Sequence, residues 1–130
     1  MEVAIRVYRI LRHLTSYVAI DAGEVVDGII AESDETILGV YRNDLIHSQS
    51  NIVVSDQGLR WWDESGEVAF VRFTDIESVT VVGEKTTAET IRLSTKQGEA
   101  AVFKIQGGEG KLREVWGFYH FLIRVLSDLS

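Results

Sequence analysis

The strongest constraint on the fold of this 130-residue chain lies between residues 37 and 105, where short segments of alternating apolar and polar residues follow one another. Alternation with a period of two is typical of strands that bury one face. Four-residue polar clusters such as Ser55-Asp56-Gln57-Gly58 and Lys96-Gln97-Gly98-Glu99 separate neighbouring segments, which is a hairpin connection. Consecutive hairpins predict an antiparallel barrel or sandwich rather than a βαβ arrangement.

About seven strands follow from this pattern. We expect them at residues 37–41, 52–54, 59–62, 68–73, 76–82, 91–94 and 101–105. Trp61 and Trp62 are adjacent in the third strand, so one should point into the core and the other away from it. The outer tryptophan is either covered by the N-terminal helix or part of a protein-binding patch.

Residues 111–129 predict a C-terminal amphipathic helix that closes the domain. One face of this helix is suited to plug a barrel and carries Leu112, Val115, Trp116, Tyr119, Leu122, Ile123 and Leu126. Phe118, Phe121 and Val125 widen the apolar arc to about 220°, well beyond the ~100° stripe of a one-sided surface helix. We therefore expect another element to cover these three side chains.

A second apolar stripe lies at the N-terminus, where residues 3–18 repeat apolar side chains at helical spacing. The stripe consists of Val3, Val7, Ile10, Leu11, Leu14 and Val18, and the opposite side carries Arg6, Arg9, Arg12 and His13. A helix of this length is not stable alone, so its stripe must be covered. Residues 21–32 predict a second short helix, or a continuation of the first that bends near Asp21.

Charge is distributed unevenly around the net value of −7. Residues 1–20 hold three arginines and one glutamate, which is 3 − 1 = +2, and the remainder holds 10 bases and 19 acids, which is −9. An acidic body disfavours binding to nucleic acid. The basic segment either seeks an anionic partner or docks on its own domain.

The absence of cysteine excludes disulfides and thiolate metal sites, and it fits a reducing compartment. The apolar runs are too short to span a membrane, and three arginines interrupt the stretch where a signal peptide would be apolar. These features predict a soluble cytoplasmic protein.

The order of motifs resembles the prokaryotic branch of the pleckstrin-homology-like family over residues 36–128. The resemblance rests on Ile-Leu-Gly-Val-Tyr-Arg-Asn at 37–43, Ile-Val-Val-Ser-Asp-Gln-Gly-Leu-Arg-Trp-Trp at 52–62, Phe-Thr-Asp-Ile-Glu-Ser-Val at 73–79 and the helix residue Trp116. It implies a mainly β (α+β) fold, a seven-stranded barrel or sandwich capped by the C-terminal helix. We expect a helical extension over 1–35 and a pleckstrin-homology-like domain over 36–130, together forming one compact unit.

Lipid-binding members of that family carry lysines and arginines in the first strand–strand loop. Here the loop of residues 42–51 offers Arg42 and His47 against Asp44, which argues against a phosphoinositide at the usual site.

No set of residues predicts an active site, a metal or a cofactor. His13, His47 and His120 lie on separate predicted elements and lack ligand spacing. The Gly107–Lys111 segment lacks the spacing of a phosphate-binding loop, and a flexible link between strand and helix is the simpler interpretation. His47-Ser48 is a sequence neighbour pair rather than a catalytic triad. We therefore expect a protein that is not an enzyme.

The sequence favours a non-catalytic protein-interaction or self-assembly module. The candidate interaction surface pairs the N-terminal stripe with the helix flank, within one chain or between chains, and comprises Val3, Val7, Ile10, Leu14, Phe118, Phe121 and Val125. The alternative is a peripheral membrane module in which Arg6, Arg9 and Arg12 of the N-terminal helix contact anionic lipid. An enzyme is the third and weakest interpretation.

Overall fold

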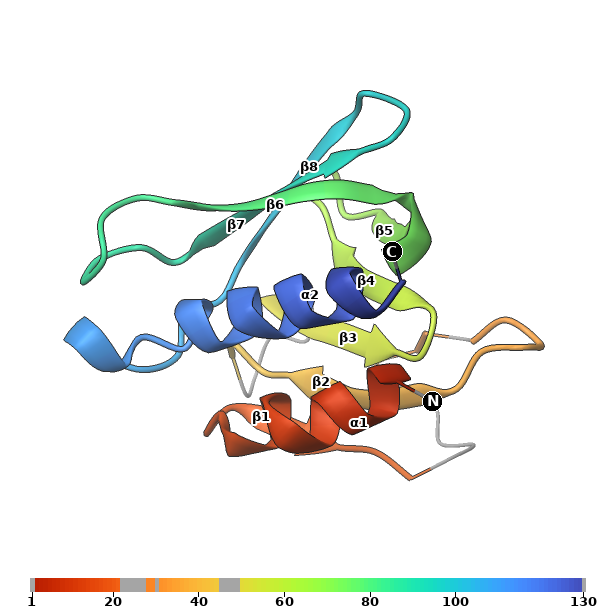
Figure 1. Cartoon of the computed structure of the whole chain (residues 1–130), viewed down its shortest axis with the longest axis horizontal. Coiled ribbons are helices and arrows are strands. Elements are labelled where there is room, and N and C mark those ends of the chain that lie inside the picture. The colour runs from red at the N-terminus through yellow and green to blue at the C-terminus, as the bar shows by residue number, and fades with distance from the viewer. Residues whose placement is uncertain (1, 22–27, 30, 45–49, 130) are drawn as a thin grey trace.

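The computed structural model describes residues 2–21, 28–29, 31–44 and 50–129 and has an α+β fold with two antiparallel sheets (Figure 1). The five-stranded sheet has the order β1 (Tyr17–Ala19), β2 (Ile37–Tyr41), β3 (Ile52–Ser55), β4 (Gly58–Trp62) and β5 (Val68–Arg72). The three-stranded sheet has the order β6 (Ile76–Val82), β7 (Thr90–Thr95) and β8 (Ala100–Lys104). The short helix η3 (Phe73–Asp75) connects the two sheets.

The seven strands expected from alternation are present as β2 to β8, and each pairs in antiparallel fashion with its neighbour within a sheet. The tight β3–β4 hairpin is held by Ser55 Oγ, which accepts the backbone N–H groups of Gln57 and Gly58 at 3.1 Å each. Among the described strands none is shared between the two sheets, so the sheets are not closed into a barrel.

The N-terminal helix is shorter than its apolar stripe predicts. Helix α1 spans Glu2–Arg9, the short helix η1 spans Leu11–His13, and the chain then becomes extended at Leu14, whose ψ is 133°. The helix expected to reach residue 18 is therefore wrong over its last turns. Residues 17–19 form β1 instead, and they pair in antiparallel register with residues 39–41 of β2.

The expected boundary at residue 35 falls between β1 and β2, which are paired strands of one sheet. The second helix expected over 21–32 lies largely outside the described residues. Within that segment, Gly28 has a φ of 78° and Ile29 belongs to a β-bridge rather than a helix.

The C-terminal helix α2 spans Val115–Leu129 and follows the short helix η4 (Gly110–Leu112). In Figure 1, α2 crosses the molecule between the three-stranded sheet and α1, and it contacts β6, β7 and α1. Its deepest side chains have no exposed surface: Val115, Phe118, Phe121, Leu122 and Val125.

The expected division of the α2 faces is therefore wrong. Phe118, Phe121 and Val125 belong to the centre of the core, whereas Leu112 is 83% exposed and Ile123 is 37% exposed. The helix is apolar over so wide an arc because it contacts a sheet on one side and α1 on the other.

Aromatic side chains join both sheets to α2 through the centre of the core. The ring centroids of Trp61 and Phe103 lie 4.9 Å apart, and those of Phe103 and Phe118 lie 5.7 Å apart. Phe118 is 5.9 Å from Phe121, which is in turn 6.1 Å from Phe73. Tilted and edge-to-face pairs of this kind add to the stability that comes from burial alone.

Trp61 and Trp62 lie on opposite faces of β4, as the strand geometry predicts. Trp61 is 4% exposed within the main core. Trp62 is half-buried and packs against a smaller cluster formed by Ile29, Ile37, Val40 and Val53. Helix α1 packs in the main core and is absent from this smaller cluster.

Candidate functional site

The residues of the candidate interaction surface lie together inside this chain. Val3 and Val7 of α1 are 7% and 6% exposed, and they share one hydrophobic cluster with Phe118, Phe121 and Val125 of α2. Ile10 and Leu14 pack against the same cluster and are partly buried. In the folded chain these side chains therefore contact one another and do not present a free apolar surface.

Helices α1 and α2 run antiparallel, and polar and small residues set their approach. The Arg6 guanidinium forms a bidentate pair with the carboxylate of Asp128 at 2.8 and 2.9 Å. Near the other end, Gly117 leaves room for Leu14, since an added Cβ would lie 2.8 Å from Leu14 Cδ2. Arg6 thus fastens α1 to the end of α2 and is not free for an anionic partner.

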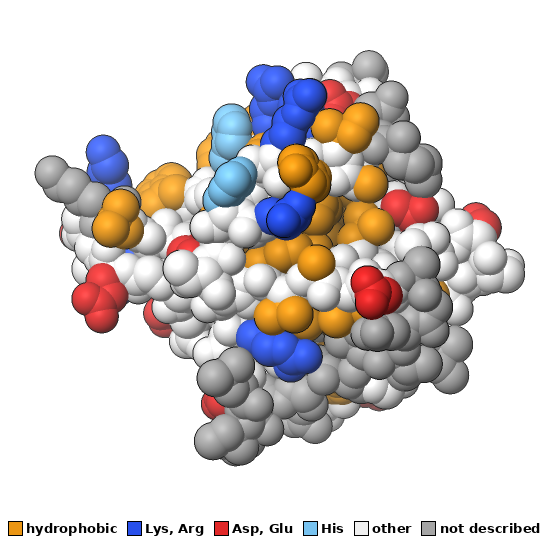
Figure 2. Space-filling view, turned by 90° about the horizontal axis from the view of Figure 1, so that it is seen from below, with side chains coloured by type: hydrophobic (Ala, Val, Ile, Leu, Met, Phe, Trp, Pro, Cys, Tyr) orange, Lys and Arg blue, Asp and Glu red, His pale blue; other side chains and the backbone are white. Residues whose placement is uncertain are grey.

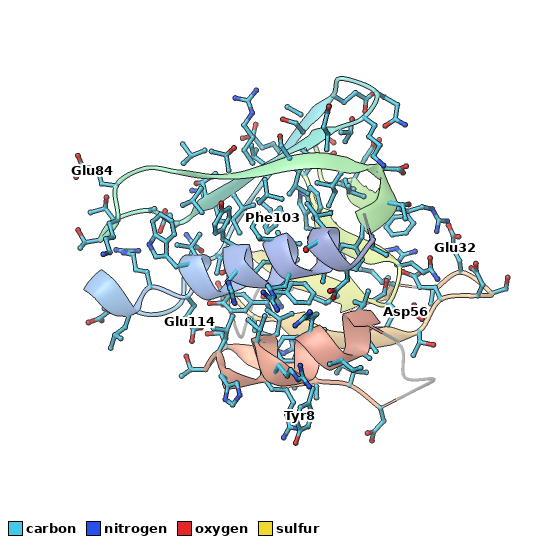
Figure 3. All side chains as sticks on the ribbon, in the orientation of Figure 1. Tyr8, Glu32, Asp56, Glu84, Phe103 and Glu114 are labelled. Atoms are coloured by element: carbon cyan, nitrogen blue, oxygen red, sulfur yellow. The ribbon has the colours of Figure 1, made fainter. Side chains whose placement is uncertain are left out.

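Arg9 and Arg12 are exposed, and the Arg12 guanidinium lies 4.5 Å from the centre of the Tyr8 ring. Tyr8 points away from the body of the protein (Figure 3) and is 63% exposed. Figure 2, seen from the side on which α1 lies, shows Lys, Arg and His side chains beside exposed apolar ones. Two of the three predicted anionic-partner contacts therefore remain on the surface.

The buried side chain of Glu114, at the start of α2, is the centre of a hydrogen-bond network (Figure 3). Its carboxylate accepts the Thr15 N–H at 2.6 Å, the Ser16 N–H at 3.4 Å and the Tyr41 hydroxyl at 2.8 Å. The Tyr41 oxygen accepts the Gly107 N–H at 3.0 Å, and burial together with Glu114 raises the pKa of Tyr41. Because these bonds tie the η1–β1 connection to α2, they explain why the chain leaves the helical path before β1.

Gly107 belongs to this network. An added Cβ would lie 2.2 Å from the Tyr41 oxygen and 2.6 Å from Glu114 Oε1. The glycine after β8 is therefore required by close approach, which is more specific than the flexible link expected from sequence.

A second buried carboxylate, Glu35, lies beside β3 and β4. It accepts hydrogen bonds from the Arg60 guanidinium and the Ser55 hydroxyl, and the guanidinium lies 3.8 Å from the centre of the Phe70 ring. Burial acts to raise the pKa of Glu35, but the bonds from Arg60 and Ser55 outweigh it and lower the pKa below its ordinary value. The partners of this charge are supplied by the chain itself, so the cluster serves the fold.

The histidines do not come together. His13 and His120 are exposed, and His47 lies outside the described residues. Within the described parts of the chain, no group of three His, Cys, Asp or Glu residues is placed to hold a metal ion. No helix in those parts combines the length and hydrophobicity needed to cross a bilayer.

A groove of about 570 Å³ opens between β8 and the ends of β3, β4 and β5. Trp61 and Phe103 contribute its aromatic wall, with both rings more than nine-tenths buried. Two of its lining residues are alanines, whose small side chains leave the space open: Ala69 of β5, which pairs with Trp61, and Ala101 of β8. Phe103, which is labelled in Figure 3, also packs against Phe118 of α2, so the groove borders the main core.

Strand β8 forms one edge of its sheet and pairs only with β7. Ile105 donates its N–H to Glu89 O, so the odd-numbered residues of β8 bond toward β7. Antiparallel strands alternate, which turns the N–H and C=O groups of Ala100 and Val102 toward the free edge. Within the described chain, these groups have no hydrogen-bond partner.

Asn43 closes one end of this edge. Its Nδ2 donates to Lys104 O at 2.7 Å, and its Oδ1 accepts the Gln106 N–H at 2.8 Å. A side-chain amide presents the same donor and acceptor as a peptide group. Asn43 therefore binds β8 as an added strand would, and the edge beyond it is unoccupied by any described residue.

Sequence reasoning did not find this groove. Its described lining residues come from three separate parts of the chain, and no motif marks their proximity: residues 43 and 50–52, residues 61–64 and 69, and residues 90, 100–104 and 106. The available signals were the small pair Ala100-Ala101 at the start of one predicted strand and the adjacent pair Trp61-Trp62 in another.

Comparisons with protein-family models, with curated proteins and with solved structures gave no match for this chain.

Proposed function

We propose that this chain is a non-catalytic protein-interaction module that binds an extended segment of a partner protein along β8. The observation that carries the proposal is that one strand has both a free edge and an apolar groove of about 570 Å³ beside it. Strand addition of this kind combines main-chain hydrogen bonds for affinity with a pocket for specificity. The groove volume is in the usual range of ligand sites, several hundred Å³.

The pleckstrin-homology-like resemblance is part of this proposal. It is supported by the order of the elements, in which β2 to β8 are followed directly by α2. The free edge of β8 exists because the two sheets are not closed into a barrel.

A second copy of this chain should bind β8 less favourably than a segment of a different protein. Two copies would each bring a net charge of −7, and like charges oppose close approach. Asp63 and Glu64 line the groove, so a second copy would have to meet this acidic rim. A neutral or basic segment meets no such cost.

The variant Val102→Pro tests the proposal, because proline at this position removes an edge N–H without removing a bond to β7. The matched control is Val68→Pro on β5, one of the two edge strands of the five-stranded sheet, at a residue that does not line the groove. A library of random displayed peptides is selected on each full-length variant. Amide chemical shifts of the wild type are then followed with an enriched peptide.

We expect peptides to be enriched on wild type and on Val68→Pro but not on Val102→Pro, with the largest shift changes between Ala100 and Lys104. Equal enrichment on the wild type and both variants, or no enrichment on the wild type, would overturn the proposal. Light scattering of the wild type and the two variants tests whether a second copy is the occupant. A dimer that dissociates only in Val102→Pro would show that β8 binds a second copy.

A second function, binding to an anionic membrane surface, is favoured by one observation. Arg9 and Arg12 of the N-terminal segment are exposed next to Tyr8 and Ile5, although the protein as a whole is acidic. Because the apolar stripe of α1 is buried, a membrane would have to contact the exposed face of α1. Each basic side chain near an anionic surface contributes roughly 1 kcal/mol to the binding free energy.

Co-sedimentation with phosphatidylcholine vesicles, with and without phosphatidylserine, tests this second function. We expect weak binding to the anionic vesicles at low salt, lost in Arg9→Glu/Arg12→Glu and kept in the control Arg92→Glu, an exposed base on β7. A wild-type chain that stays in the supernatant would exclude it.

A further inference from the structure

Resting on the proposed function, we infer that the segment bound along β8 carries a large apolar side chain close to a lysine or arginine, and that Asn51 donates a hydrogen bond to it. Three features of the groove wall lead to this class of ligand: an unpartnered buried amide, an apolar space walled by aromatic rings, and an acidic rim.

Asn51 is fully buried and lines the groove, yet its Nδ2 has no hydrogen-bond partner among the described residues. Its Oδ1 accepts the Asp44 N–H at 3.3 Å, and this bond identifies Nδ2 as the atom without a partner. A buried donor without an acceptor is costly, and a ligand that supplies the acceptor recovers that cost. An extended peptide has a carbonyl at every residue, so it is suited to accept this N–H.

The apolar space beside β8 predicts a large side chain in the ligand. Its walls include the rings of Trp61 and Phe103 and the side chain of Ile52, whereas Ala69 and Ala101 contribute only methyl groups. The two alanines leave room that no described side chain of the protein occupies. In an added strand every second side chain faces this space, so one anchor residue fills it.

The rim of the groove carries two acids from the β4–β5 turn, Asp63 and Glu64. The Ser65 hydroxyl donates a hydrogen bond to Asp63 Oδ1 at 2.6 Å. This bond is the main cause that lowers the pKa of Asp63, so the carboxylate stays charged. Glu64 is exposed and has no ion pair within the described chain. Lys104 is the only base among the described lining residues, and its Nζ lies 3.9 Å from Glu89 Oε1. The rim is therefore complementary to a basic ligand side chain.

The test uses a peptide enriched on the full-length protein, together with two altered versions of it. One version replaces its basic residue by glutamate, and the other replaces its largest apolar residue by alanine. Each is titrated against wild type, Glu64→Lys, Asn51→Ala and the control Glu84→Lys. Glu84 is an exposed acid that does not line the groove, so it matches the charge change made at Glu64.

We expect each altered peptide to bind wild type about tenfold more weakly, which is the effect of about 1.4 kcal/mol. On Glu64→Lys the order of the basic and acidic peptides should reverse, and on Glu84→Lys it should remain. Asn51→Ala should weaken all three peptides by a similar factor of about ten, as expected for loss of one hydrogen bond to a buried donor.

Peptides that bind equally well with lysine or glutamate would overturn the basic requirement, and an alanine version that binds fully would overturn the anchor. Unchanged affinity in Asn51→Ala would overturn the hydrogen bond. In each of these cases peptides still bind at β8 and the proposed function stands. The absence of any peptide that separates wild type from Val102→Pro would instead remove the proposed function itself.

Discussion

The space between the two sheets is closed on one side and open on another, and the two regions are built from similar side chains. On the closed side, Phe118 and Phe121 of α2 have no exposed surface, and α1 packs beyond them. On the open side, Trp61 and Phe103 are also buried but border a groove of about 570 Å³. The rings of Phe103 and Phe118 are in contact, so the two regions meet inside one core.

What differs is the element that lies over the aromatic side chains. An amphipathic helix supplies large apolar residues every three or four positions and fills the closed side. Among the described residues, the open side receives an edge strand with Ala100 and Ala101 and a polar turn. We therefore expect the unfolding free energy to depend mainly on side chains of the closed side, whereas substitutions on the open side should reduce it only slightly.

The largest effect should come from Phe121→Ala, in the closed region. Removing a fully buried phenylalanine costs about 3–5 kcal/mol of unfolding free energy through lost burial and the cavity left behind. The control Ile123→Ala, a partly exposed position on the same helix, should cost far less. Urea denaturation measures both, and similar losses at the two positions would contradict the packing described for α2.

Glu114→Ala should give the next largest effect, about 2–3 kcal/mol, because the buried Tyr41 hydroxyl and the partly buried N–H groups of Thr15 and Ser16 lose their acceptor. Tyr41→Phe should cost less, since it removes the bonds of the Tyr41 hydroxyl to Glu114 and Gly107 but leaves the N–H groups of Thr15 and Ser16 with their acceptor. If Glu114→Ala unfolded at the same urea concentration as wild type, the hydrogen bonds of Glu114 would not stabilise the closed region.

Lowering the pH should reduce the unfolding free energy partly through Glu35, which lies outside both regions. Because its folded pKa is below its ordinary value, its contribution to stability is present above the unfolded pKa and is lost as the pH falls through the folded pKa. Glu35→Gln should therefore flatten the pH dependence of the unfolding free energy below about pH 4.5. An identical slope in wild type and variant would contradict the Arg60 and Ser55 pairing.

The smallest effect on stability should come from Asn51→Ala in the open region, below about 1 kcal/mol. The variant loses the bond from Asp44 N–H but also removes a buried donor that has no partner. A loss above about 2 kcal/mol would mean that Asn51 supports the fold, and the comparison between the two regions would then fail.

The antiparallel strands could be predicted because their signals are local. Period-two alternation and a turn such as Ser55-Asp56-Gln57-Gly58 are readable within a dozen residues, and all seven expected strands are present. The C-terminal helix was predicted for the same reason, since its apolar spacing is continuous from Val115 to Leu126.

The end of α1 could not be predicted locally. Val18 continues the helical spacing of Val7, Ile10 and Leu14, yet it pairs with Val40 in β1 and β2. The deciding contact comes from Glu114, nearly a hundred residues away, which accepts the N–H groups that follow Leu14. Periodicity indicates which side chains can share a face, but a distant hydrogen-bond acceptor decided where the helix stops.

The sequence by itself determined that two apolar surfaces need cover, the stripe of Val3 and Val7 and the flank of Phe118 and Phe121, because water penalises exposed apolar area wherever it lies. Only the tertiary structure decided that these surfaces cover each other within one chain. It alone brought Asn51, Trp61 and Ala101 to one groove beside a free edge. Hydrophobic burial is non-directional and can be read from composition along a helix, whereas a groove depends on how three separate segments meet.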